Sequence, residues 1–184
     1  MNRIRVHIPD QVLDLIDPAD ALLRRYSVST AARGVGERNG SFCTPRGRHV
    51  IRAKIGAGRP INTVFVERRP TGEIYSPALA AATGRRDWIL TRILWLSGCE
   101  PGFNRLGAVD TMRRCIYIHG SPSSVAMGTP GSMGCIRMHN EDLLEVFDRV
   151  QPGTPVEILD QSAGEHAVLC AAEDSVTLPP FAVR

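Results

Sequence analysis

The chain has 184 residues, of which 22 are basic and 19 acidic, and its formal net charge is +3. This length suits one domain with a single apolar core. Charges this evenly balanced, with no block of lysine or arginine, argue against a nucleic-acid partner. The first residues lack the apolar segment of a signal peptide, and the sequence offers no candidate membrane span. We therefore expect a cytoplasmic protein, with the periplasm as the alternative if a leader is missing from this sequence.

The pattern of turns and short apolar runs predicts a mostly β protein. The chain contains 17 glycines and 13 prolines, which favour turns, and several apolar runs alternate with polar residues. We predict loops at residues 34–47 and 100–110 and a short helix at 77–82. The predicted strands lie at residues 4–8, 12–16, 26–30, 50–55, 64–67, 89–96, 115–119 and 156–158.

One main helix is predicted after residue 139. Asn140 is a good N-cap residue, and the two acidic residues that follow it suit the positive end of the helix dipole. Pro152 and Gly153 stop the helix. Its expected buried stripe consists of Leu143, Leu144, Phe147 and Val150.

The predicted strand at residues 115–119 places a histidine away from the core. Successive side chains of a strand face opposite ways. Ile116 and Ile118 therefore share one face, which we assign to the core, while Cys115, Tyr117 and His119 share the other. On that second face a histidine is available for chemistry.

Downstream of this strand, Cys135 follows a glycine and is the candidate nucleophile. A thiol becomes nucleophilic when a neighbour takes its proton or stabilises its thiolate. His119 can act as the base, and the carbonyl of Gly120 can orient its imidazole. Gly134 allows a tight turn in which backbone N–H groups converge, so we expect them to bind an oxyanion and to keep the thiol ionised.

Two alternatives use the same residues differently. The first alternative is a zinc site, because the spacing of two cysteine–histidine pairs resembles that of zinc ligands: Cys115 with His119, and Cys135 with His139. Residues four apart on a strand lie about 13 Å apart, too far to share one ion. We therefore expect no metal and no cofactor. His139 stays open as an alternative base for Cys135.

The chain has five cysteines, so at least one is unpaired. In the cytoplasm most should be free thiols. Apart from the candidate nucleophile, we interpret each as a small buried apolar residue. These residues are Cys43, Cys99, Cys115 and Cys170.

The pairing of His119-Gly120 with the downstream run Ser132-Met133-Gly134-Cys135-Ile136-Arg137 resembles the catalytic signature of the YkuD-type L,D-transpeptidase family. Residues 26–30 and the turn Thr44-Pro45-Arg46-Gly47 resemble further parts of that family. The likeness covers roughly residues 3–160. We therefore predict a catalytic domain over residues 1–160 and a tail or covering segment over 161–184.

The resemblance implies a β-sandwich-like fold and an enzyme acting on peptidoglycan stem peptides. In this family the cysteine attacks the carbonyl of the third stem residue, usually diaminopimelate. Terminal D-alanine leaves, and water or an amine then resolves the thioester. By position, Cys135 is the nucleophile, His119 the base and Gly120 its orienting carbonyl, with the oxyanion hole around Gly134.

The resemblance also implies a substrate-binding surface and partners. The partners are stem peptides or soluble muropeptides, with carbapenems as inhibitors. Arg137 is expected to brace the nucleophile loop, with a substrate carboxylate as its other role. The implied substrate-binding residues are Tyr117, Ser132, Met133 and Arg137.

Two departures from the family pattern matter. The family places a histidine where this chain has Met133; we expect its thioether to form a packed wall beside the thiol. If that histidine were the essential base, the chain would be an inactive module that binds stem peptides. The missing export signal favours water as the acceptor, hence an L,D-carboxypeptidase of murein recycling. Transpeptidation in the periplasm is the alternative.

Overall fold

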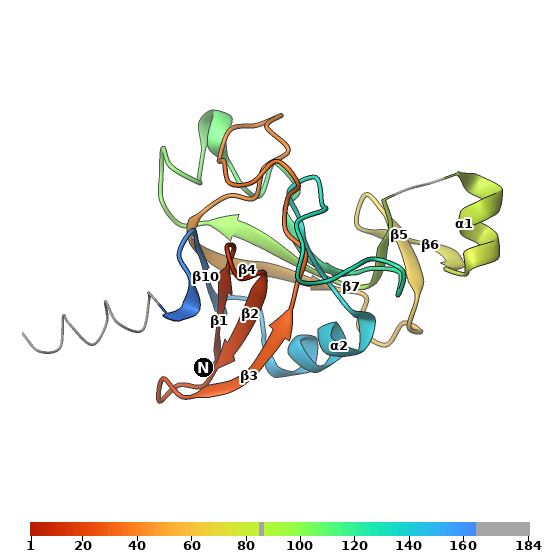
Figure 1. Ribbon diagram of the computed structural model, residues 1–184, viewed down its shortest axis with the longest axis horizontal. Coiled ribbons are helices and arrows are strands. Elements are labelled where there is room, and N and C mark those ends of the chain that lie inside the picture. Colours follow the sequence, from red (N-terminus) through yellow and green to blue (C-terminus); the bar gives the residue numbers. More distant parts are fainter. Residues whose placement is uncertain (85–86, 165–184) are drawn as a thin grey trace, which may run out of the picture.

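A computed structural model describes residues 1–84 and 87–164 of the chain (Figure 1). Residues 165–184, with Cys170 and most of the predicted tail, lie outside that description. The helices are α1 (Pro77–Thr83) and α2 (Asn140–Arg149), with a 3-10 turn at Gly107–Val109. The strands are β1 (Arg3–His7), β2 (Val12–Ile16), β3 (Leu22–Ser27), β4 (Gly47–Ile55), β5 (Thr63–Val66), β6 (Arg69–Ile74), β7 (Ile89–Gly98), β8 (Tyr117–Gly120), β9 (Ile136–Met138) and β10 (Pro155–Leu159).

The long strand β7 organises the sheet. The main path of hydrogen-bonded strands is β3-β2-β1-β10-β4-β7-β5-β6, and β8 and then β9 branch from β7. Two pairs are parallel, β1 with β10 and β8 with β9. The parallel pairing of β8 and β9 sets the predicted histidine strand beside the segment that follows the predicted nucleophile.

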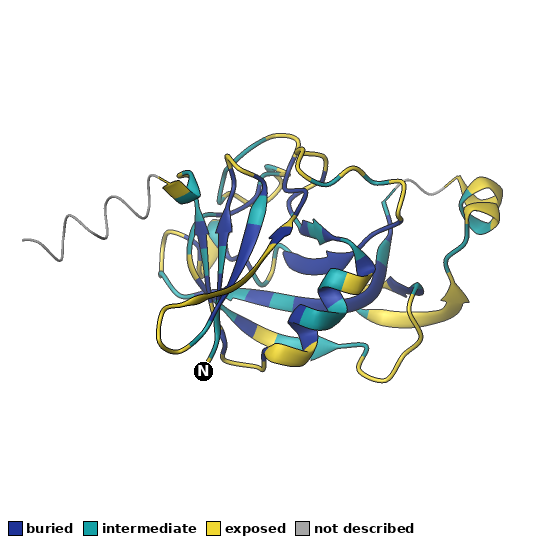
Figure 2. Cartoon of the chain, turned by 60° about the horizontal axis from the view of Figure 1, so that its bottom comes forward, coloured by how far each residue is buried: buried dark blue, intermediate teal, exposed yellow. Residues whose placement is uncertain are grey.

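One apolar core lies between the curved sheet and α2. It contains side chains from β1, β2, β4, β7, β8, β9 and β10 together with one face of the helix (Figure 2). Val6, Leu13, Leu94, Ile118 and Leu143 are all fully buried in it. Burying such a side chain contributes about 1.5–3 kcal/mol. Opposite parts of the sheet thus share one core, as the predicted β-sandwich-like fold requires.

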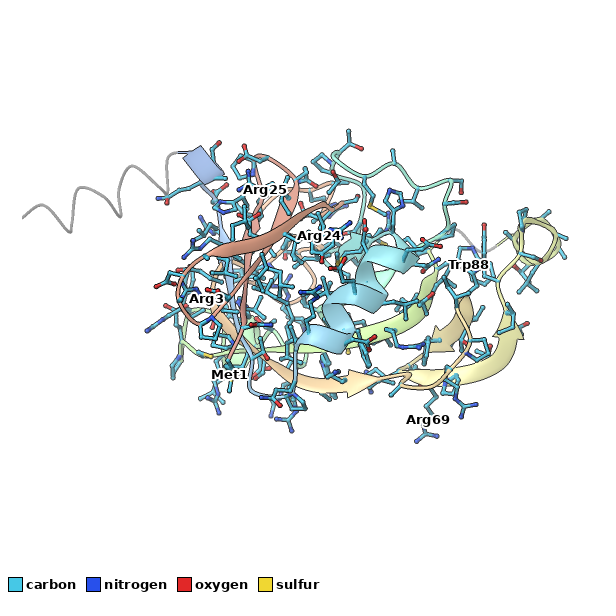
Figure 3. All side chains as sticks on the ribbon, turned by 90° about the horizontal axis from the view of Figure 1, so that it is seen from below. Met1, Arg3, Arg24, Arg25, Arg69 and Trp88 are labelled. Atoms are coloured by element: carbon cyan, nitrogen blue, oxygen red, sulfur yellow. The ribbon has the colours of Figure 1, made fainter. Side chains whose placement is uncertain are left out.

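We call β5, β6 and α1 the arm, because they project from this body (Figure 1). Every residue of β6 is exposed, and α1 has no buried residue. A small apolar cluster joins the arm to the start of β7; in it Tyr75 and Leu79 pack against Val64, Trp88 and Leu90. Figure 3 shows Trp88 beside this projecting end.

The helix α1 has no buried residue, and its two ends are set by capping residues. The Ser76 side chain caps the helix by accepting a hydrogen bond from the Leu79 N–H at 3.2 Å. Pro77 occupies the first turn, where it suits a helix, and Gly84 ends the helix in the left-handed conformation. Within the described part of the chain, no helix is long and apolar enough to cross a membrane.

The structure confirms the predicted β-rich class and corrects several details. The third strand runs from Leu22 to Ser27 rather than over 26–30, and both β6 and β9 were not predicted. The N-cap of α2 is His139, not Asn140, whose side chain instead faces inward. On the buried side of α2, Val146 takes the place predicted for Leu144, which is half-buried.

Candidate active site

A cavity of about 540 Å³ lies where β8 and β9 meet the loop at residues 39–42 and the tip of the arm. It is also lined by residues of β7 and of the segment leading to β9. All four residues predicted to bind substrate reach it, as do the predicted nucleophile and base. The six are Tyr117, His119, Ser132, Met133, Cys135 and Arg137.

Strand pairing brings the nucleophile and the base to one place. In the parallel register Ile118 lies opposite Ile136 and His119 opposite Arg137. Cys135, the residue just before β9, therefore lies beside Tyr117. The Tyr117 N–H donates to the Cys135 sulfur at 3.4 Å, and the thiol donates to the Cys115 carbonyl at 3.5 Å.

The imidazole of His119 is oriented by a backbone carbonyl. Its side chain is 1% exposed, and Nδ1 lies 2.9 Å from the Gly120 oxygen. Because a carbonyl only accepts, Nδ1 carries the proton, which leaves Nε2 as the basic nitrogen. Burial lowers the pKa of His119, so the ring is neutral near pH 7.

Gly120 is needed at its position because two groups crowd it. A Cβ atom there would clash with Oδ1 of Asn140 and would lie 2.8 Å from the Leu90 oxygen. Asn140 is held by hydrogen bonds to Thr91 at 2.7 Å and to Asn62 at 2.8 Å. This inward polar cluster explains why Asn140 does not cap α2.

The Cys135 thiol is neutral in the resting structure. Burial raises its pKa to about 12. The hydrogen bond from the Tyr117 N–H lowers the pKa, but by less than burial raises it. The prediction that backbone donors keep the thiol ionised is therefore wrong, because desolvation outweighs them. Among residues 1–84 and 87–164, the thiol hydrogen bonds to backbone and the imidazole to Gly120. No hydrogen bond joins the Cys135 sulfur to the His119 imidazole among these residues.

The turn before Cys135 is shaped by a serine hydroxyl. Ser132 Oγ donates to the Cys135 carbonyl at 2.5 Å and accepts the Gly134 N–H at 3.1 Å. Thr44 donates its hydroxyl to the Gly134 carbonyl at 3.0 Å. Ser132 thus lines the cavity, but its hydroxyl is hydrogen bonded within the turn.

Gly134 has a φ of 126°, in the region that favours glycine. Its N–H is taken by Ser132, so it is not available to an oxyanion as predicted. Within the described residues, no group accepts the N–H of Cys135. That N–H is the donor left for an oxyanion next to the sulfur.

Met133 lies at the mouth of the cavity with 57% of its surface exposed. The prediction of a packed wall beside the thiol is therefore wrong. Met133 is exposed between two buried residues, Ser132 and Gly134.

Arg137 braces the nucleophile segment, as predicted. Its guanidinium donates to Asp87 at 2.5 Å and to the Gly131 carbonyl at 3.0 Å. These contacts tie β9 to the segment entering β7 and to the turn that precedes Ser132.

Two further arginines line the cavity and were missed in the sequence. Arg68, at the tip of the arm, donates to the Tyr117 hydroxyl at 2.9 Å and to the Cys115 sulfur at 3.3 Å. Arg114 donates to the Cys43 carbonyl at 2.6 Å and so holds the loop over the cavity. Among 22 basic residues, no spacing distinguished these two.

A model of the L,D-transpeptidase catalytic domain (YkuD) matches residues 1–158 of the chain. The chain belongs to the L,D-transpeptidase family. It is 42% identical over 110 residues to a probable L,D-transpeptidase of Salmonella typhimurium, ErfK/SrfK; this covers 57% of the chain and 35% of that protein. The chain therefore spans about a third of the length of this L,D-transpeptidase.

Solved L,D-transpeptidase structures share the fold. An enzyme from Mycobacterium smegmatis matches with a TM-score of 0.50 and 19% identity, over 86% of this chain and 58% of that one. The L,D-transpeptidase LdtMt1 in complex with imipenem matches with a TM-score of 0.51 and 18% identity over the same shares. The predicted β-sandwich-like L,D-transpeptidase fold is confirmed.

Proposed function

We propose that this chain transfers acyl groups of peptidoglycan stem peptides through a thioester at Cys135. The observation that carries the proposal is the placement of Cys135 and the oriented His119 on one cavity, in a chain of the L,D-transpeptidase family. The bond cleaved is that between diaminopimelate and D-alanine. Water as acceptor gives an L,D-carboxypeptidase, and an amine gives a transpeptidase.

The proposed steps follow from the protonation states of the two groups. Because the thiol is neutral, Nε2 of His119 removes its proton as the sulfur attacks the carbonyl. The Cys135 N–H stabilises the oxyanion. His119 then gives the proton to the departing amine of D-alanine, and in the second half it activates water or the acceptor amine.

The charges that line the cavity support a peptide substrate with carboxylates. Arg68 and Arg114 face the cavity, while Glu67 and Asp87 add negative charge at its edge. A stem peptide ending in diaminopimelate and D-alanine carries both carboxylates and an amine, which these groups complement. Such charge pairing fixes the orientation of a ligand more than its affinity.

An inactive module that binds stem peptides is the second candidate. Two observations favour it: Met133 stands where the family has a histidine, and the thiol is hydrogen bonded to backbone rather than to His119. Under this alternative the cavity binds the peptide and Cys135 forms no adduct.

The test is incubation of the protein with a disaccharide tetrapeptide, with and without a free amine, followed by mass spectrometry. Loss of D-alanine supports acyl transfer, and hydrolysis as the main product supports the carboxypeptidase role in murein recycling. An amine-exchanged product supports transpeptidation. The Cys135→Ala variant is the control and should give no product.

Incubation with imipenem separates the inactive module from an enzyme. A covalent adduct on Cys135 is expected for the enzyme. Unchanged tetrapeptide together with an unmodified Cys135 would overturn the proposal. The Met133→His variant, which restores the family pattern, should change the rate only modestly because this side chain lies at the exposed mouth.

A further inference from the structure

A second thiol faces the cavity that holds Cys135. Cys115 lines the same cavity and is half-buried. The Cys135 sulfur lies 3.5 Å from the main-chain oxygen of Cys115, so the two residues are in direct contact. Both also pack against the apolar cluster of Phe65, Ile93 and Tyr117.

A guanidinium contacts the sulfur of Cys115. Nη1 of Arg68 donates a hydrogen bond to this sulfur at 3.3 Å. The Cys135 thiol instead donates a hydrogen bond to the Cys115 carbonyl and accepts one from the Tyr117 N–H.

The other described cysteines do not share this arrangement. The Cys43 sulfur is directed at the carbonyls of Arg33 and Ser41, and Cys99 lines a separate cavity beside β1, β4 and β10. Within the described residues, the hydrogen bond from Cys135 to Cys115 is the one that joins a cysteine sulfur to another cysteine.

We propose that Cys115 and Cys135 form a reversible disulfide when the protein meets a peroxide. The Cys115 sulfur attacks one peroxide oxygen and loses its proton; the S–O bond forms, the O–O bond breaks, and the hydroxide released takes that proton and becomes water. Cys135 then attacks the sulfenic sulfur; the S–S bond forms and the second hydroxide leaves with the Cys135 proton as water. Two thiols are oxidised, and one hydrogen peroxide is reduced to two waters.

The bond would remove the nucleophile of the proposed reaction. The resulting loss of acyl transfer rests on the proposed function, whereas formation of the bond does not. The site would thereby be protected from irreversible oxidation, because a disulfide can be reduced and a sulfinic acid generally cannot.

The sequence makes the bond simple to detect. Trypsin cleaves after Arg114 and after Arg137, and residues 115–137 contain no other lysine or arginine. The resulting peptide holds Cys115 and Cys135 and no other cysteine. An internal disulfide therefore lowers the mass of this one peptide by two hydrogens and leaves both cysteines closed to alkylation.

The experiment treats the full chain with hydrogen peroxide, alkylates it and maps the peptides with and without dithiothreitol. We expect the two-hydrogen loss in peptide 115–137, reversed by dithiothreitol. Oxidation of Met127 or Met133 adds oxygen instead, so mass distinguishes the two. Cross-links to peptides carrying other cysteines, or sulfenic and sulfinic products alone, would overturn the proposal.

Two variants sharpen the test. Cys99→Ser, the matched control, should form the bond as the unmodified chain does. Cys115→Ser should lose the bond, so its peptide 115–137 should show no loss of two hydrogens. A chain that forms the bond but releases no D-alanine would refute the proposed function and leave this inference intact.

Discussion

The body and the arm of this chain are held together very differently. Among residues 1–84 and 87–164, the core of the body buries twenty apolar residues, whereas the cluster between the arm and β7 buries three. The body carries Cys135 and His119, while the arm contributes Arg68 at the edge of the same cavity. The reacting groups thus lie on the part with the most burial, and the part with little burial shapes the opening.

Removing the nucleophile gives the largest expected effect and tests the role of the body. Cys135→Ala should abolish D-alanine release, because it removes the sulfur that attacks the carbonyl. The thermal midpoint should stay close to that of the unmodified chain. Release that persists in this variant would show that the chemistry lies elsewhere.

Removing the base should be the next largest effect. His119→Ala should lower kcat/KM by about 10²–10⁴, the usual contribution of a general base. His139→Ala is the matched control and should change it little, since His139 lies in a different cavity, beside Asn62 and Tyr75. The reverse ranking of the two variants would assign the base to His139.

Truncations in the two regions compare their packing directly. Leu94→Ala in the body should lower the free energy of unfolding by about 2–5 kcal/mol, as a fully buried leucine does. Leu79→Ala on the half-buried arm should cost less than about 1.5 kcal/mol. Urea denaturation measures both, and equal losses would show that the arm is an integral part of the core.

The pH dependence follows from the buried groups of the body. Burial lowers the pKa of His119, so its basic form persists to below pH 6.5, and kcat/KM should fall about tenfold per unit only below that pKa. Burial lowers the pKa of His49 to about 4. The unfolded chain binds protons more readily at both histidines, so stability falls as the pH drops below 6.5.

Two measurements check this dependence. A profile of kcat/KM from pH 5 to 9 should be flat at its alkaline end, because the pKa of Cys135 is raised to about 12. Thermal midpoints should decline towards pH 5. A rate that rises steadily up to pH 9 would show that the thiolate, and not the neutral pair, is the reacting form.

The arm should give the smallest effect. Arg68→Ala removes the hydrogen bond to Tyr117 and one positive charge of the cavity, and we expect kcat/KM to fall by about tenfold or less. KM should carry most of the change, with Arg69→Ala as an exposed neighbouring control (Figure 3). A loss as large as that of His119→Ala would place Arg68 among the catalytic groups.

Local patterns were sufficient for much of the fold. Alternation in β1 and β10 is visible in the sequence because mainly one face of each strand is buried, whereas β2 and β7 are visible as apolar runs because they are buried on both faces. The strand β6 was missed because all its residues are exposed and it contains Pro70 and Gly72. The turn that precedes it places Glu67 and Arg68 at φ of 47° and 68°. Neither residue is a type typical of such turns, so the sequence does not indicate this turn.

The sequence by itself determined the family, the candidate nucleophile and the candidate base, because these depend on residue types at fixed short spacings. It also determined the contact between His119 and Gly120, since adjacent residues need no tertiary partner. The tertiary structure alone decided the pairing of β8 with β9, which sets Cys135 beside Cys115. It also decided the neutral thiol, because burial is a property of the whole fold and no spacing along the chain reveals it.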